Sequence, residues 1–218
     1  MKFAMKKFLS LAAILGALAG TASAAPYYMT APAGGALTPY DIQPVYSIEG
    51  IYNFSDNSDV PDTYGARINF SLYNNAISTA RHQVTLSAGY EMGTCNLRYD
   101  DAEISKEKIE LQRIPLTIGY DLNVALTKSI MLDLGAKGGY TFGFIDSKVK
   151  SGTLKGEKDS ANTGGFAFAL TAGLKVQFSD VIYGKIAYEF GRTFFSDHLD
   201  KHINYNTHGI VVGLGCQF

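Results

Sequence analysis

The chain has 218 residues, with 19 Lys and Arg, 20 Asp and Glu, and a formal net charge of −1. This balance excludes the strongly basic footprint of a typical nucleic-acid-binding protein. A hydrophobic content of 46% excludes a mostly disordered chain, and two cysteines are too few for a disulfide scaffold. The 23 glycines and 12% aromatic residues favour β-structure, and the length allows one domain.

Residues 1–24 have the pattern of a secretory signal peptide. Three lysines among the first seven residues form a basic start, residues 8–20 are apolar, and a run of small residues ends at Ala24. The apolar part is shorter than the roughly 20 residues of a membrane-spanning helix, which disfavours a membrane anchor. We expect cleavage after Ala24 and a flexible periplasmic leader over residues 25–41, where Ala, Pro and Gly dominate.

From residue 42 onward, apolar side chains recur at every second position, which is the periodicity of β-strands. Residues 83–92, for example, read QVTLSAGYEM. Eight such segments follow one another, and each has about the 9–11 residues that a tilted membrane-spanning strand needs. The predicted connectors alternate between long and short, as in outer-membrane barrels. The long ones are 55–63, 93–109, 145–163 and 191–207, and the short ones are 74–81, 121–129 and 179–181.

One face of these segments carries glycine and small polar residues, which suit a narrow packed interior. The other face carries large apolar and aromatic side chains that gather near the segment ends, as in the aromatic girdles of an outer-membrane barrel. A secreted β-sandwich is the alternative. The sequence thus predicts an all-β fold, an eight-stranded antiparallel up-and-down transmembrane β-barrel over residues 42–218. The predicted girdle residues are Tyr52, Phe54, Tyr64, Tyr90, Phe142, Phe144, Phe166 and Phe190 at one end, and Tyr120, Phe178 and Phe218 at the other.

The face that carries glycine and small polar residues also carries charged residues. These can be paired across neighbouring strands by counting outward from each turn. In the first half of the chain, the count sets Glu49 beside Arg67 and Glu91 beside Arg113. Cross-strand neighbours of opposite charge stabilise a sheet. The sequence therefore predicts two ion pairs inside the barrel.

In the second half, the count sets Asp133 opposite Lys175, which in turn faces Lys185, so Asp133 is expected near two lysines. Lys137 and Glu189 are expected at one level, with Thr171 between them. The complete predicted network comprises Glu49, Arg67, Glu91, Arg113, Asp133, Lys137, Lys175, Lys185 and Glu189.

Two interpretations of this network remain open: a gated ion path and a polar plug that fills the lumen. We favour the plug, with Tyr73 contributing to it. The interior of an eight-stranded barrel is just wide enough for side chains, and buried charges are tolerated when they are paired.

Residues 113–120 read RIPLTIGY, and the last segment reads HGIVVGLGCQF and ends on Phe218. With the signal peptide and the eight segments, these features resemble the small eight-stranded outer-membrane barrels of the OmpA/OmpX type, in the single-domain OmpX-like form. The resemblance implies a location in the outer membrane and contact with its lipid and lipopolysaccharide. It also implies that the barrel-assembly machinery reads Phe218 as an assembly signal.

The expected function is structural or adhesive, exerted by a monomer whose extracellular loops meet a host or envelope partner. The 93–109 segment can extend its strands as a protruding sheet with an edge for partners. A lipid A-modifying enzyme and a narrow solute or ion channel are the alternatives. We expect no catalytic residue, no cofactor and no metal.

Three clusters are candidate chemical sites, and we interpret all three as solvated loops. The last long connector holds Ser, His and acidic side chains that a lipid A-modifying enzyme would need, but no organised nucleophile and base. The metal candidates follow no ordered ligand spacing. The enzymatic set is Ser196, Asp197, His198, Asp200 and His202; the metal sets are His198, His202 and His208, and Asp56, Asn57, Ser58, Asp59 and Asp62.

The two cysteines are predicted to lie near opposite ends of the barrel. Cys95 belongs to the external end of one segment and Cys216 to the periplasmic end of the last. A disulfide requires Cα atoms within about 7 Å, far less than the hydrocarbon thickness of about 30 Å. We therefore expect no bridge between them.

Overall fold

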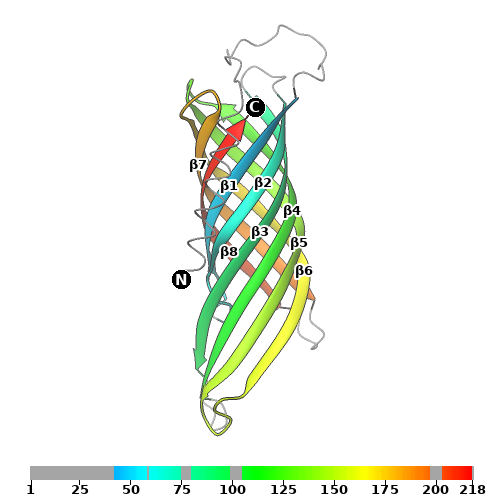
Figure 1. Cartoon of the computed structure of the whole chain (residues 1–218), viewed down its shortest axis with the longest axis vertical. Coiled ribbons are helices and arrows are strands. Elements are labelled where there is room, and N and C mark those ends of the chain that lie inside the picture. The colour runs from blue at the N-terminus through cyan, green and yellow to red at the C-terminus, as the bar shows by residue number, and fades with distance from the viewer. Residues whose placement is uncertain (1–41, 58, 75–79, 99–104, 197–202, 218) are drawn as a thin grey trace.

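The structure is a computed structural model that describes residues 42–57, 59–74, 80–98, 105–196 and 203–217. Eight antiparallel strands form one closed barrel in chain order, and β1 pairs with both β2 and β8 (Figure 1). The predicted fold class is confirmed. The signal peptide and the leader lie outside the described residues. The strands are β1 (Ile42–Ser55), β2 (Thr63–Asn74), β3 (Ala80–Arg98), β4 (Lys106–Ala125), β5 (Ile130–Ser151), β6 (Lys158–Gln177), β7 (Ile182–Ser196) and β8 (Ile203–Gln217).

Odd-numbered residues line the interior of the barrel and even-numbered residues face outward, because successive side chains of a strand point to opposite faces. In β1, for example, the buried residues are Val45, Ser47, Glu49, Ile51 and Asn53. The described part of the chain contains no helix with the length and apolar character needed to cross a membrane.

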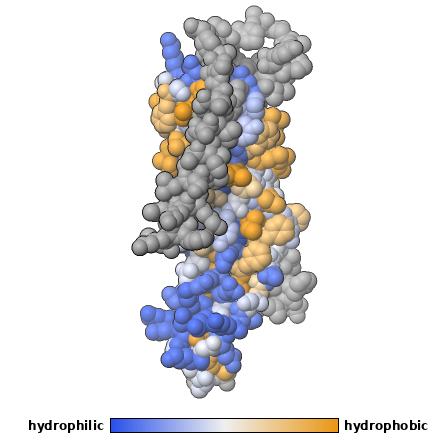
Figure 2. Space-filling model, in the orientation of Figure 1, coloured by the Kyte–Doolittle hydropathy of each residue, from blue (hydrophilic) through white to orange (hydrophobic). Residues whose placement is uncertain are grey.

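The outer surface of the barrel is an apolar belt, and hydrophilic residues gather at the lower end in the view of Figure 2. Tyr64, Phe166 and Phe178 of the predicted girdles are 57%, 71% and 66% exposed, so their rings point outward. Tyr140 packs against Phe166 with ring centroids 5.6 Å apart. The large apolar side chains are thus arranged toward lipid and not toward a protein core.

Strands β3 to β6 continue beyond the ring of eight, and they form the long lower extension in Figure 1. The pairing of β2 with β3 ends at Gly93, and the pairing of β6 with β7 ends at Gly164. In contrast, β4 and β5 stay paired out to Ser151. We call this extension the protruding sheet; it consists of residues 94–98, 106–110, 146–151 and 158–160.

The protruding sheet is formed by two of the predicted long connectors, and it confirms the expectation for one and corrects the other. The 93–109 segment extends its strands as expected, but the interpretation of 145–163 as a connector is wrong, because β5 reaches Ser151 and β6 begins at Lys158. The reason is physical. Outward-facing residues change from apolar to polar where the strands leave the apolar belt, so the alternation of hydropathy fades while the backbone pairing continues.

The register of β5 and β6 differs by two residues from the prediction. Asp133 lies opposite Gly173, and Lys175 lies opposite Met131. The prediction counted from strand ends at residues 144 and 164, whereas the pairing continues to Lys148. A shift of two keeps every side chain on its predicted face, since the side-chain period of a strand is two.

Candidate functional site: the charged barrel interior

All nine predicted charged residues line the barrel interior. Seven of them are buried, with exposed fractions from 0% for Asp133 to 6% for Glu49 and Glu189. The side chains of Lys137 and Lys185 are 16% and 11% exposed. Because an unpaired buried charge is strongly destabilising, each of these groups requires a partner of opposite charge.

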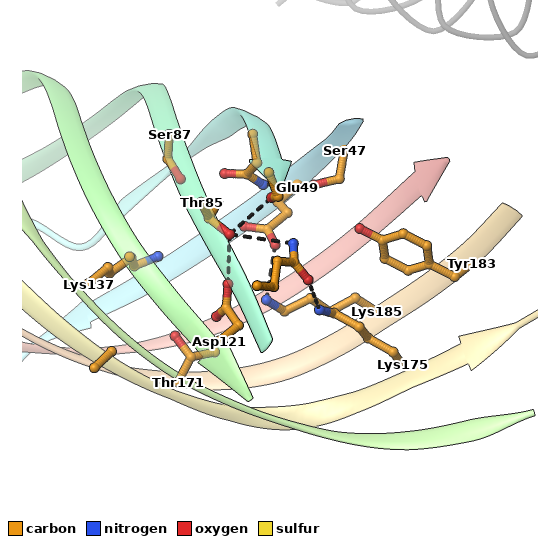
Figure 3. A pocket seen from close by; sticks show the side chains of 15 residues that line it. Ser47, Glu49, Thr85, Ser87, Asp121, Lys137, Thr171, Lys175, Tyr183 and Lys185 are labelled. Atoms are coloured by element: carbon orange, nitrogen blue, oxygen red, sulfur yellow. Dashed lines mark hydrogen bonds and ion pairs between the residues drawn. The ribbon is translucent and has the colours of Figure 1, made fainter. Parts of the chain in front are cut away.

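At the short-turn end of the barrel, one carboxylate lies between two lysines. Asp133 Oδ1 is 2.9 Å from Lys175 Nζ, and its Oδ2 is 2.9 Å from Lys185 Nζ. The two lysines are direct partners on β6 and β7, so the carboxylate offsets their repulsion. Lys185 also pairs with Glu49 at 3.2 Å, and Lys175 donates a hydrogen bond to Gln83 at 3.1 Å. Figure 3 shows Glu49, Lys175 and Lys185 pointing into one space.

In the middle of the barrel, Arg67 reaches across the lumen from β2 to Glu189 on β7. Its Nη1 and Nη2 donate hydrogen bonds of 2.8 and 3.0 Å to the two carboxylate oxygens, an arrangement that is stronger than a single contact. Lys137 forms a second ion pair with Glu189. Arg67 lies farther from Glu91, at 3.5 Å, and from Glu49, at 3.9 Å.

Toward the long-loop end, Arg113 organises a third group. Its Nη2 is 2.5 Å from Glu91 Oε2, and its Nε donates to the same oxygen at 3.0 Å. Nη1 donates to the Tyr205 hydroxyl at 2.8 Å, and Nη2 donates to Thr63 Oγ1 at 3.0 Å. Asn53 donates to Glu91 at 2.8 Å. The three groups connect through Glu49, Arg67 and Glu91 into one network along the lumen.

The structure confirms the predicted register of β1 with β2 and of β3 with β4, where Glu49 lies opposite Arg67 and Glu91 lies opposite Arg113. The main partner of Arg67 is nevertheless Glu189, a pair that the sequence does not predict. Counting from turns relates only neighbouring strands, so contacts across the lumen are invisible to it.

Thr171 lies opposite Glu189, whereas Lys137 lies opposite Ala169, two residues from its predicted level. The register shift of β5 against β6 is the cause. The long Lys137 side chain spans the difference and still reaches Glu189. Tyr73, predicted to contribute to the plug, has a side chain outside the described part of the structure.

The network also includes uncharged residues that were not predicted from the sequence. Tyr205 and Asn53 hold Arg113 and Glu91, and Gln83 binds Lys175. In the sequence, the only indication of their role is that they are odd-numbered and therefore belong to the inward face of their strands. That position predicts an inward side chain but names no partner.

Eight of the nine charged residues lie directly opposite a glycine of a neighbouring strand, Lys175 being the exception. A Cβ on Gly65 would lie 2.9 Å from Glu91 Cγ, so the glycine leaves the space that the longer side chain occupies. The pairs are Glu49 and Lys185 with Gly213, Arg67 with Gly89, Glu91 with Gly65, Arg113 with Gly143, Asp133 with Gly173, Lys137 with Gly119, and Glu189 with Gly209.

Two small cavities lie among these side chains. One of about 30 Å³ is lined by Glu49 and Lys185, among others (Figure 3). A second of about 50 Å³ is lined by Arg67 and Glu91, among others, and Lys137 borders both. Such volumes hold a few water molecules. The chemistry available in the interior is thus mutual neutralisation of fixed charges, with room for a few water molecules between them.

The residues considered for lipid A chemistry are not brought together by any described contact. Ser196 ends β7. Asp197, His198, Asp200 and His202 lie outside the described residues, so the enzymatic arrangement stays an untested alternative.

The third histidine of the predicted metal set faces outward on β8. His208 Nδ1 contacts the Tyr188 hydroxyl, and its ring packs against Phe190 with centroids 5.4 Å apart. Within the ranges that the structure describes, no three His, Cys, Asp or Glu side chains are grouped to hold a metal ion.

The acidic residues between β1 and β2 bind neighbouring strands. Asp56 accepts hydrogen bonds from the backbone and side-chain nitrogens of Asn206, at 2.9 and 2.6 Å. Asp62 accepts one from the Ser55 amide at 3.0 Å. Ser58 lies outside the described residues. The contacts that are visible hold the connection in place.

Both cysteines are free thiols. Cys95 lies on the protruding sheet, and Cys216 lies near the end of β8 at the short-turn end. Phe218 is outside the described residues, so its role as an assembly signal stays a prediction.

Comparison with known proteins places this geometry in a family. A search of curated proteins finds no match. Among solved structures, a major outer membrane protein of Thermus thermophilus aligns with a TM-score of 0.53 at 9% identity, covering 80% of this chain and 99% of that one. Ail, the attachment invasion locus protein of Yersinia pestis, aligns at 0.44 and 10% identity, covering 81% and 97%. Neisserial surface protein A aligns at 0.45 and 12%, covering 82% and 97%.

At these identities the likeness to solved structures concerns the fold alone. The family match is broader. The outer membrane protein β-barrel domain matches residues 8–218, which include every strand and the whole interior network. The chain therefore belongs to the family of outer membrane protein β-barrel domains, and its place is the outer membrane.

Proposed function

We propose that this barrel is a monomeric surface-interaction protein that meets its partner through the protruding sheet, while the charged interior closes the lumen. The apolar belt then contacts the lipid and lipopolysaccharide of the outer membrane. The observation that carries the proposal is the continued pairing of β3 to β6 beyond the ring of eight. A barrel whose only role was to cross the membrane would not need four strands that extend beyond the closed eight-stranded part.

The orientation of the protruding sheet supports an external partner. It lies at the end with the long connectors, which in outer-membrane barrels is the extracellular end. Residues 158–163 of β6 pair with β5, but no described strand pairs with them on the β7 side. Such an edge can accept an added strand, and Lys158 at its tip is the kind of residue that limits unspecific pairing.

The contacts inside the barrel favour a polar plug over an ion path. The nine charges are five basic and four acidic, and the closest contacts of Arg67 run across the lumen to Glu189. Moving an ion through this region would require these contacts to open, in an interior where partnerless charges are costly. The small cavities offer room for water between the contacts but no wide passage.

A shortened barrel tests the proposed contact element. Residues 95–109 and 147–159 are each replaced by an Asn-Gly turn, since Thr94 lies opposite Glu110 and Asp146 lies opposite Ser160. Bacteria that express the full or the shortened protein at equal outer-membrane abundance are compared for adhesion to host cells and extracellular-matrix proteins. We expect adhesion above the empty-vector level for the full protein alone.

Equal adhesion by the two proteins, or none by either, would overturn the proposal. Two further measurements address the alternatives. Steady, large single-channel currents from the pure protein in planar bilayers would favour a channel. Release of acyl chains from lipid A would favour an enzyme.

A further inference from the structure

The outer face of the protruding sheet carries a row of three lysines. Lys108 on β4 lies directly opposite Lys148 on β5, which lies directly opposite Lys158 on β6. Lys148 and Lys158 are exposed, and the Lys108 side chain is 33% exposed. We call these three residues the lysine row. Figure 2 shows hydrophilic residues at this end of the molecule.

Such a row is unfavourable for the sheet by itself, since like charges directly opposite each other on neighbouring strands repel. Lys108 is paired with Glu110. In the described part of the chain, no carboxylate lies within 4.0 Å of the Lys148 or Lys158 ammonium groups. Among the described residues, the row therefore presents at least two positive charges without a neutralising carboxylate.

The lysine row borders a groove of about 540 Å³ to which Lys150 also contributes. The acidic residues Glu110 and Asp146 lie opposite each other in the adjacent row, on the side toward the apolar belt. Both are engaged, Glu110 with Lys108 and Asp146 with the Ser160 hydroxyl at 2.8 Å. Lys148 and Lys158 thus lie nearer the tip of the sheet than Glu110 and Asp146, while Asp159 also lines the groove and the exposed Glu157 lies beyond Lys158.

The position of the row argues against lipid headgroups as its ligand. Lys148 lies four residues beyond Phe144 and Lys158 eight residues from Phe166. This corresponds to about 13 and about 26 Å along the strands, or about 10 and about 20 Å along the membrane normal for strands tilted by about 40°. The polar layer of a bilayer adds only about 5–7 Å on each side. A lipid phosphate would also meet Glu110 and Asp146 before it met the lysines. An anionic ligand that approaches from the aqueous side reaches Lys148 and Lys158 without passing Glu110 or Asp146.

We propose that the lysine row binds a linear anionic polysaccharide through its sulfate, phosphate or carboxylate groups; this rests on the proposed function of the protruding sheet as the contact element. Neighbouring strands are about 4.8 Å apart, so the three ammonium groups can follow a chain over about 10 Å. A chain with repeated charges satisfies all three at once. A nucleic acid duplex fits less well, because it requires a longer basic face than this short row beside two carboxylates.

The binding test uses the full protein in lipid nanodiscs, with dextran sulfate as the probe and uncharged dextran as its matched control. We expect dextran sulfate to bind and dextran not to bind. If three contacts each release a counterion as in single-stranded polyanions, affinity should fall roughly 20-fold between 50 and 200 mM salt. The double variant Lys148→Gln/Lys158→Gln should lose at least ten-fold in affinity, and Lys148→Arg should keep it.

Lys155→Gln serves as the control for Lys148→Gln, because Lys155 is an exposed lysine of the same protrusion outside the row. Equal losses from these two single substitutions would show unspecific charge attraction and overturn the proposal. It would also be overturned if the unaltered protein failed to bind dextran sulfate, or bound duplex DNA or phosphatidylglycerol vesicles more tightly. If adhesion to cells still depended on the protruding sheet in such a case, the proposed function would stand without the lysine row.

Discussion

Arg67 forms its closest ion pair with Glu189 across the lumen, at 2.8 Å, although Glu49 is its direct neighbour in the sheet and lies 3.9 Å away. The contact joins β2 to β7, which are not adjacent in the ring. The Arg67 guanidinium thus connects two strands that are not neighbours in the barrel wall. Its contribution to the free energy of unfolding can be measured.

Glu189→Gln should weaken the barrel more than Glu49→Gln. The first change leaves Arg67 and Lys137 without their nearest carboxylate, and breaking a buried pair in this way costs about 3 kcal/mol or more. Glu49→Gln removes only a distant contact of Arg67 and the 3.2 Å contact of Lys185. Lys185 retains its ion pair with Asp133. Urea unfolding of protein folded into lipid vesicles gives both values. A larger loss for Glu49→Gln would show that sheet neighbours, and not cross-lumen contacts, dominate.

Asp133→Asn should leave the facing ammonium groups of Lys175 and Lys185 without their shared carboxylate. We expect a loss of about 3–5 kcal/mol in the free energy of unfolding. Adding Lys175→Gln to this variant should restore part of the loss, because it removes one of the two repelling charges. The double-mutant cycle is the measurement, and strictly additive losses would contradict the shared-carboxylate arrangement.

The strand count, the inward face and the nine interior charges could be predicted from the sequence because all of them follow from a period of two. The partner of Arg67 could not, since it depends on barrel closure, which brings β7 within reach of β2. The extent of β5 and β6 could not either. Beyond Phe144 both faces of the hairpin are largely polar, and backbone pairing leaves no trace in hydropathy. The contact between Tyr205 and Arg113 could not be predicted either. The sequence places Tyr205 on the inward face, but nothing in it indicates which side chain the hydroxyl group binds.

The unaltered protein should give no steady open current in planar bilayers, because charged side chains meet across its lumen. Arg67→Ala/Glu189→Ala removes the principal crossing, which lines the larger of the two cavities, and should allow water to connect the two, with a small, reproducible conductance. The control Glu110→Ala/Lys148→Ala changes an outer face and should stay closed. Large currents from the unaltered protein, or none from the lumen variant, would contradict this account.

Gly139→Ala should disturb the barrel far more than Gly138→Ala, although the two positions are adjacent. A Cβ on Gly139 would lie 2.0 Å from the Leu116 carbonyl oxygen, whereas one on Gly138 would lie 3.8 Å from its nearest neighbour. Overpacking of this kind costs about 1–3 kcal/mol, and more where backbone must move. Folding yield and the heat-dependent gel shift compare the two. Similar yields would show that β4 and β5 can separate to accept the extra atom.

Cys95 should react slowly with maleimides at neutral pH. Burial raises the pKa of its thiol, and the nearby carboxylates of Asp59 and Glu107 raise the pKa further, so less of the reactive thiolate is present than for a free cysteine. The labelling rate should climb with pH until the raised pKa is passed. In a Cys216→Ser background, Glu107→Gln should speed labelling at neutral pH by removing one of the nearby negative charges. If Glu107→Gln does not speed labelling, the slow reaction would be due only to limited access of the reagent to the thiol.

The glycines opposite the interior charges also constrain how this barrel can change. Gly213 lies opposite both Glu49 and Lys185, and a Cβ at that position would lie 2.9 Å from Glu49 Cγ, so it would displace the side chain whose carboxylate pairs with Lys185. A side chain at Gly213 is thus expected to be accepted only together with a shorter residue in place of Glu49. Gly65 and Gly173 are constrained differently, because a Cβ there would lie 2.0 Å from the Tyr90 carbonyl oxygen and 2.4 Å from the Ile186 carbonyl oxygen, which no shortening of a side chain relieves.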